Sequence, residues 1–122
     1  MTKTILTVDD SPSVRQMVRL TLTGAGFAVV EACDGEDALA KVGAQRFDAI
    51  LTDQNMPRLD GLGFIRKFRT SPDSIGVPIV FLSTESRDTL KEQARAAGAT
   101  GWMMKPFDQA QLLAVMKKVV GA

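Results

Sequence analysis

Short apolar runs alternate with amphipathic segments along the whole chain. We expect strands at 5–8, 28–32, 48–52, 77–82 and 100–104. The segments between these runs carry apolar residues three and four positions apart, a spacing that is typical of amphipathic helices. Strands that alternate with helices in this way predict an α/β fold, a three-layer sandwich with helices on both faces of a five-stranded parallel sheet.

Residues that favour helix ends stand between the two kinds of segment. Pro12 is suited to the first position of a helix. Side chains that can accept a hydrogen bond at a helix N-terminus are Ser11, Asp34, Asp60, Ser86, Asp88 and Asp108. Gly24, Gly26 and Gly98 mark helix C-termini. The polar segment 70–76 is expected to be a loop. Because no linker or repeat interrupts the pattern, we expect one domain over residues 1–122.

Charged residues stand where three of the expected strands end. Asp9 and Asp10 follow the first strand, Asp53 follows the third, and Lys105 follows the fifth. The carboxyl ends of parallel strands share one edge of a sheet, so these side chains are expected to meet. The first and third strands are then neighbours, which favours the flavodoxin-like, CheY-like strand order 2-1-3-4-5.

Three carboxylates in one crevice need a cation or a bound proton. Two like charges about 4 Å apart repel by roughly 4 kcal/mol at an effective dielectric constant near 20. Carboxylate oxygens are ligands for Mg²⁺, and a carboxylate beside Mg²⁺ indicates phosphoryl chemistry. The pattern therefore predicts a magnesium-dependent site for phosphoryl groups.

The composition excludes several classes of function. With 15 basic and 14 acidic residues, the net charge of +1 leaves no basic surface for nucleic acid. We expect no membrane segment and no signal peptide, and hence a cytoplasmic location. The absence of histidine removes catalytic triads that use it and histidine-ligated zinc. Cys33 is expected to be a small buried or half-buried residue, and Met103, Met104 and Met116 are expected in or near the core.

The residues at the predicted crevice suit formation of an acyl phosphate. The Asp53 carboxylate can attack a phosphoryl group. Mg²⁺ held by Asp10, Asp53 and the backbone carbonyl of Asn55 can neutralise the transferring oxygens, while Asp9 orients metal-bound water. Lys105 supplies a point charge on a flexible stem.

Two further residues suggest how a charge change can reach the surface. Ser83 follows the fourth strand, and its hydroxyl can donate to a phosphoryl oxygen on Asp53. Its movement would pull the loop 84–87 with it. Trp102, on the neighbouring fifth strand, can repack as that loop shifts.

At these residues the chain resembles the receiver domain of two-component response regulators. The motifs that carry the resemblance are Asp9-Asp10, Asp53-Gln54-Asn55-Met56-Pro57, Asp60-Gly61, Ser83, Gly98-Ala99 and Lys105-Pro106-Phe107. The resemblance implies phosphorylation of Asp53 by a partner histidine kinase. It also implies a Mg²⁺ cofactor at Asp9, Asp10, Asp53 and the Asn55 carbonyl, with Ser83 and Lys105 on the phosphoryl oxygens. It implies no enzymatic turnover beyond self-phosphorylation and self-dephosphorylation.

Within that family the chain is most similar to single-domain, CheY-like chemotaxis regulators. This likeness implies a CheA-like kinase, a monomeric state, and a flagellar motor switch protein as partner. Such proteins bind partners through the fourth helix, fifth strand and fifth helix. The matching residues here are Arg87, Lys91, Arg95, Trp102, Gln109 and Lys117. The indole of Trp102 replaces the commoner tyrosine or phenylalanine, which puts an inward swing of the ring in question.

Three alternatives stay open on the sequence. The first is a phosphate sink that drains the kinase without binding a motor. The second is a Mg²⁺-dependent phosphatase with an aspartate nucleophile, although Asn55 stands where such enzymes carry a general acid. The third is a flavin-binding module on the same fold, which Asp9 and Asp10 disfavour because they would repel a flavin phosphate.

Overall fold

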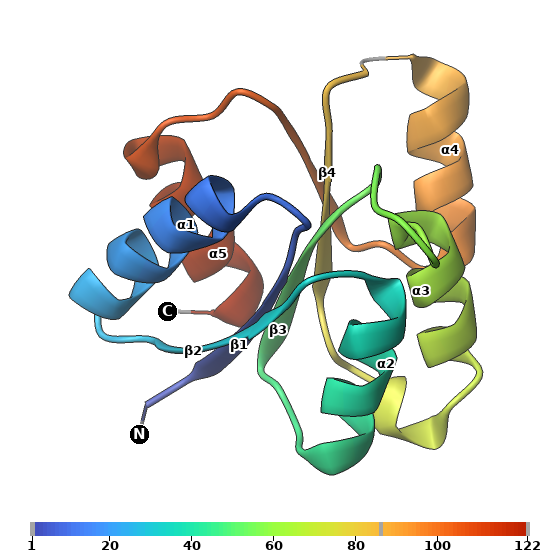
Figure 1. Ribbon diagram of the computed structural model, residues 1–122, viewed down its shortest axis with the longest axis horizontal. Helices are drawn as coiled ribbons and strands as arrows, with labels where there is room; N and C mark the ends of the chain where they lie inside the picture. Colours follow the sequence, from blue (N-terminus) through green and yellow to red (C-terminus); the bar gives the residue numbers. More distant parts are fainter. Residues whose placement is uncertain (1, 86, 122) are drawn as a thin grey trace.

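The computed structural model describes residues 2–85 and 87–121 of the chain. Strands and helices alternate throughout this part, as expected (Figure 1). Their bounds are β1 Thr4–Val8, α1 Pro12–Gly24, β2 Ala28–Ala32, α2 Gly35–Ala44, β3 Ala49–Asp53, α3 Gly61–Arg69, η1 Pro72–Ser74, β4 Ile79–Ser83, α4 Asp88–Ala97, β5 Gly101–Met104 and α5 Gln109–Val120. Within these residues no helix combines the length and the apolar character that a membrane crossing requires.

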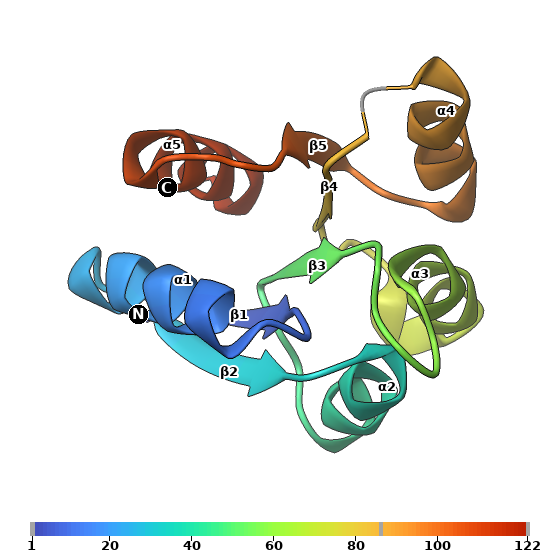
Figure 2. The same cartoon turned by 45° about the horizontal axis from the view of Figure 1, so that its top comes forward.

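The strands form one parallel sheet in the order β2-β1-β3-β4-β5, which confirms the predicted topology. Val8 of β1 lies beside Thr52 of β3, and Asp53 lies beside Leu82 of β4. All five strands therefore end along the same edge of the sheet, which Figure 2 turns toward the viewer. Residues far apart in the sequence meet at that edge.

Helices cover both faces of the sheet and bury two apolar clusters. In Figure 2, α1 and α5 lie on one side of the sheet, and α2, α3 and α4 lie on the other. Neighbouring strand residues alternate between the two clusters: Leu6 and Ile50 face one, while Ile5 and Leu51 face the other. This period of two is the geometry of a strand. The central strands β3 and β4 are buried along their whole length, as expected for a sheet covered on both faces.

Side-chain caps define the starts of most helices. Ser11, Asp34, Asp60 and Asp108 each accept a hydrogen bond from the backbone amide three residues on. Such caps are worth about 1 kcal/mol each. Helix α4 differs, because its N-cap residue Arg87 makes no side-chain capping bond. Of the two residues expected at this start, Asp88 lies in the first turn of α4 and Ser86 lies outside the described residues.

Three expectations about single residues and loops were wrong. Cys33 is exposed, because it follows the last paired residue of the edge strand β2 and no helix covers it. Met104 is 38% exposed at the end of the other edge strand, β5, whereas Met103 and Met116 are buried as expected. The segment 70–76 contains the 3-10 turn η1.

Candidate functional site: an acidic pocket at the carboxyl edge of the sheet

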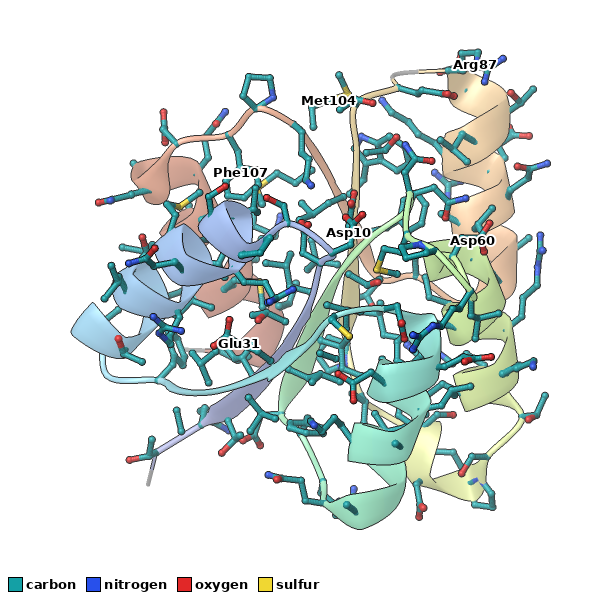
Figure 3. The ribbon with its side chains drawn as sticks, in the orientation of Figure 1. Asp10, Glu31, Asp60, Arg87, Met104 and Phe107 are labelled. Carbon is teal, nitrogen blue, oxygen red and sulfur yellow. The ribbon has the colours of Figure 1, made fainter. Side chains whose placement is uncertain are left out.

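Asp9, Asp10 and Asp53 converge at the carboxyl edge of β1 and β3. Each offers a carboxylate oxygen, and these oxygens all lie within 4.8 Å of one another. Asp9 and Asp53 are buried, whereas Asp10 is exposed. Figure 3 labels Asp10 at the end of β1, close to the end of β3. The structure thus brings together the three carboxylates that the sequence places at strand ends, and the oxygen donors suit a Mg²⁺ ion.

Lys105 enters the same pocket from the segment after β5. Its Nζ atom lies 2.8 Å from Oδ2 of Asp9 and 3.3 Å from Oδ2 of Asp53. The peptide bond between Lys105 and Pro106 is cis. The ammonium therefore stands beside both buried carboxylates, where it can also contact the oxygens of a phosphoryl group on Asp53.

The pocket holds more negative than positive charge. Burial, followed by repulsion from Asp9, raises the pKa of the Asp53 carboxyl, although Lys105 opposes both effects. Burial lowers the pKa of the Lys105 ammonium, but the hydrogen bond and charge of Asp9, together with Asp53, outweigh it and leave that pKa raised. Both shifts favour added positive charge, so the residues present fit a divalent cation.

The backbone under Asp53 is held by the loop that follows it. Gly61 packs so closely that a Cβ atom there would lie 2.4 Å from the carbonyl oxygen of Asp53. The amide of Gly61 donates to the Gln54 carbonyl, and the amide of Gln54 donates to that of Leu82. The Gln54 side chain closes the loop by bonding to Asp60. These contacts fix the end of β3. Asn55 lies exposed in this loop.

Ser83 ends β4 and is buried beside the pocket. Its hydroxyl accepts a hydrogen bond of 2.9 Å from the backbone amide of Glu85. Its carbonyl accepts one from the backbone amide of Lys105, also at 2.9 Å. The residue therefore connects the Lys105 segment to the loop that leads into α4.

Trp102 of β5 is half-buried on the face of the sheet that α4 covers. Its ring lies 5.3 Å from that of Phe81, and the ammonium of Lys91 lies 5.5 Å from the indole. The indole Nε1 atom is buried without a hydrogen-bond partner among the described residues. The ring thus already packs against the core, with its polar atom unpaired.

The expected partner surface is distributed over α4, β5 and α5. A groove of about 390 Å³ lies between α4 and β5, and its lining includes Lys91, Arg95 and Trp102. Arg87 is exposed at the start of α4, where it pairs with Glu85 (Figure 3). Gln109 and Lys117 are exposed on α5.

Sequence reasoning missed one residue that touches the pocket. Arg15 of α1 donates from Nη1 to the backbone carbonyl of Asp9 at 2.7 Å. Its place on the helix, among polar residues, gave no sign of this contact. Its other partner, Glu31, lies on β2 (Figure 3).

Comparison with known proteins identifies the family of this chain. A family model described as the response regulator receiver domain matches residues 5–117. The chain belongs to the response regulator receiver family. Among solved structures, the chemotaxis response regulator CheY4 of Vibrio cholerae is 43% identical, with a TM-score of 0.94, and the match covers 98% of this chain and 99% of that one.

Other relatives differ from this chain in protein type and in length. The receiver domain of the sensor histidine kinase PA1611 from Pseudomonas aeruginosa is 30% identical, with a TM-score of 0.91 over the full length of both chains. Its structure is described as having a magnesium ion coordinated in the active site cleft. Response regulator MprA of Mycobacterium tuberculosis is 38% identical over 122 residues, covering 98% of this chain but 51% of that protein. The chain therefore spans about half the length of the curated relatives it matches.

Membership of the receiver family has direct consequences for the pocket. Receiver domains accept a phosphoryl group on an aspartate, with a histidine kinase as the phosphodonor partner. They typically bind Mg²⁺ at an acidic pocket, and the only such cluster within the described residues is Asp9, Asp10 and Asp53.

Proposed function

We propose that this protein is a phosphorylation switch in which Asp53 accepts a phosphoryl group from a partner histidine kinase. The observation that carries the proposal is the position of Asp53. This residue is 6% exposed, its carboxylate lies at the edge where five strands end, and Nζ of Lys105 is 3.3 Å from its Oδ2 atom. A phosphoryl group bonded to this carboxylate would therefore lie beside the Lys105 ammonium.

The transfer step exchanges one bond to phosphorus for another. A carboxylate oxygen of Asp53 bonds to phosphorus as the bond from phosphorus to the donor imidazole nitrogen breaks. That nitrogen keeps the electron pair and takes a proton from water. Mg²⁺, when bound, neutralises charge on the transferring oxygens. Asp10, Asp53 and the carbonyl of Asn55 would hold it, while Asp9 holds Lys105 in place through their 2.8 Å ion pair.

The switch begins when the Ser83 hydroxyl gains an acceptor. In the present structure this hydroxyl accepts from the Glu85 amide. When a phosphoryl group stands on Asp53, Ser83 moves so that its hydroxyl donates to a phosphoryl oxygen, and this movement displaces the amide bonded to it. The loop leads into α4, whose start carries no side-chain cap. A small movement at Ser83 is therefore transmitted to the surface beside Trp102.

The surface of α4, β5 and α5 binds the output partner. Lys91 and Arg95 give the groove beside Trp102 a positive charge, which suits an acidic partner segment. Similarity to the Vibrio cholerae chemotaxis regulator supports a flagellar motor switch protein as that partner and a CheA-like kinase as the donor. The protein acts as a monomer in this scheme.

The protein is a switch and not a turnover enzyme. A phosphatase that uses an aspartate nucleophile needs a proton donor for the leaving group. Asn55, two residues after Asp53, has no carboxyl proton to give. The phosphoryl group therefore leaves by attack of water on the acyl phosphate.

Intact-mass measurement after incubation with acetyl phosphate and Mg²⁺ tests the proposal. The wild-type protein is expected to gain one phosphoryl mass, which Asp53→Asn should abolish. Asp73→Asn is the matched control, since Asp73 is an exposed aspartate near the opposite edge of the sheet. An unchanged wild-type mass, or equal gains in wild-type and Asp53→Asn protein, refutes it.

A second assay captures partners with and without beryllofluoride, and capture of a flagellar switch protein only with beryllofluoride supports the chemotaxis role.

A further inference from the structure

Arg15 of α1 bonds to the backbone of the acidic pocket, at Asp9. Its Nη1 atom donates to the Asp9 carbonyl at 2.7 Å, and its Nε atom lies 3.4 Å from Oε1 of Glu31. Arg19, one turn further along α1, pairs with the other oxygen of Glu31 at 2.8 Å. The two arginines thus share a carboxylate on β2, but Asp9 accepts from Arg15.

Asp9 is restrained at each of its polar atoms. Its amide donates to the Ala32 carbonyl, and its Oδ1 atom accepts from the Ser11 amide at 2.9 Å. Its Oδ2 atom accepts from Lys105, and its carbonyl from Arg15. These partners come from four different segments, so Asp9 is held rigidly relative to the sheet and to α1.

The restraint on the Asp9 carbonyl extends to Asp10. A peptide unit is planar, so a hydrogen bond that holds the carbonyl of Asp9 also holds the amide group and the Cα atom of Asp10, which lie in the same plane. Within the described residues, the Asp10 carboxylate has no recorded hydrogen bond that would aim it. Its direction into the pocket therefore depends on the backbone that Arg15 holds.

We propose that Arg15 is a positioning residue for the cation site: by holding the Asp9–Asp10 peptide plane, it preorganises Asp10 to bind Mg²⁺. This inference rests on the proposed function, since it assumes that the pocket binds Mg²⁺. Residues that orient metal ligands typically affect metal affinity by 10-fold to 100-fold.

The direction of the change in Mg²⁺ affinity on replacing Arg15 distinguishes a positioning role from a direct effect of its charge. Arg15 is a cation beside a cation site, so its charge alone would repel Mg²⁺, and its removal would tighten binding. Loss of positioning weakens binding instead. Arg15→Gln is expected to raise the Mg²⁺ dissociation constant roughly tenfold, as measured by calorimetric titration of the unphosphorylated protein. Arg15→Lys keeps one donor for the Asp9 carbonyl and is expected to recover part of the lost affinity.

Arg19→Gln is the matched control, because it breaks a pair with the same Glu31 on the same helix. It should leave the dissociation constant within twofold of wild type, although it also loses its ion pair with Glu31. Glu31→Gln is a second variant that keeps Arg15 and serves if Arg15→Gln does not fold. It should weaken Mg²⁺ binding by less than about tenfold, and a folded Glu31→Gln protein with wild-type affinity counts against the inference.

Unchanged or tighter Mg²⁺ binding in Arg15→Gln overturns the inference, as does an equal loss in Arg19→Gln. Failure of the wild-type protein to bind Mg²⁺ or to accept a phosphoryl group is a different result. It would refute the proposed function itself. The two failures are therefore distinguishable in one set of measurements.

Discussion

The guanidinium of Arg69 joins two loops at the edge of the sheet opposite the acidic pocket, one between α3 and β4 and the other between α4 and β5. It donates to the carbonyls of Ser74 and Val77 at 2.6 and 2.7 Å, and twice to that of Gly98 at 3.1 and 2.9 Å. Gly98 ends α4 with a positive φ of 115°, and Arg69 occupies the space where a Cβ atom would lie. Arg69→Met removes all of these bonds while keeping an apolar stem of similar length.

Removing these bonds in Arg69→Met is expected to lower the free energy of unfolding by about 3 kcal/mol. A hydrogen bond to a charged group contributes about 1.5 to 3 kcal/mol, and three carbonyls lose their donor. Water reaching these part-buried carbonyls in the variant returns some of that energy, which brings the loss below the simple sum. At a denaturant slope of about 2 kcal/mol per molar urea, the unfolding midpoint falls by about 1.5 M.

Urea denaturation followed by circular dichroism measures this loss. Arg66→Met is the matched control on the same helix, since Arg66 is exposed, and it should shift the midpoint by less than about 0.3 M. Phosphorylation by acetyl phosphate should persist in folded Arg69→Met protein because the change lies far from Asp53. Equal midpoints for the Arg69 and Arg66 variants would show that the two loops do not depend on this guanidinium.

Two further predictions concern buried groups near the pocket. The Thr7 hydroxyl is buried without a partner among the described residues, beside a void of about 10 Å³. Thr7→Val should therefore raise the unfolding free energy by about 1 kcal/mol in urea denaturation, and a loss would show that the hydroxyl bonds to water. The raised pKa of Asp53 means that the folded protein binds this proton more tightly than the unfolded chain does, so ionisation destabilises the fold as pH rises. In EDTA, the stability of Asp53→Asn relative to wild type should grow from pH 3 to pH 7, and a difference that shrinks with pH contradicts this.

The pocket could be predicted because local sequence marks strand ends. An apolar run followed by Asp9-Asp10, and another followed by Asp53, places each carboxylate at a carboxyl edge. A parallel sheet leaves one such edge, so the topology brings these carboxylates and Lys105 to the same edge. Helix starts were predictable for the same reason, since a Ser or Asp cap acts within three residues.

Two kinds of feature could not be predicted from the sequence. The first is exposure that depends on which strands lie at the edges of the sheet, and the second is contacts made by long side chains. Cys33 and Met104 belong to apolar stretches, but β2 and β5 are edge strands, so both side chains reach solvent. Arg15 and Arg69 bond to backbone carbonyls, and a carbonyl carries no residue type for a sequence pattern to detect. The packing of the Trp102 indole against Phe81 also depends on the tertiary structure.

The ion pair between Lys105 and Asp9 joins residues 96 positions apart in the chain. During synthesis, Asp9 and Asp53 therefore emerge long before Lys105 does. Until the segment after β5 docks, this lysine does not lie beside the two carboxylates. The complete pocket therefore forms only after β5 has been synthesised and has docked on the sheet.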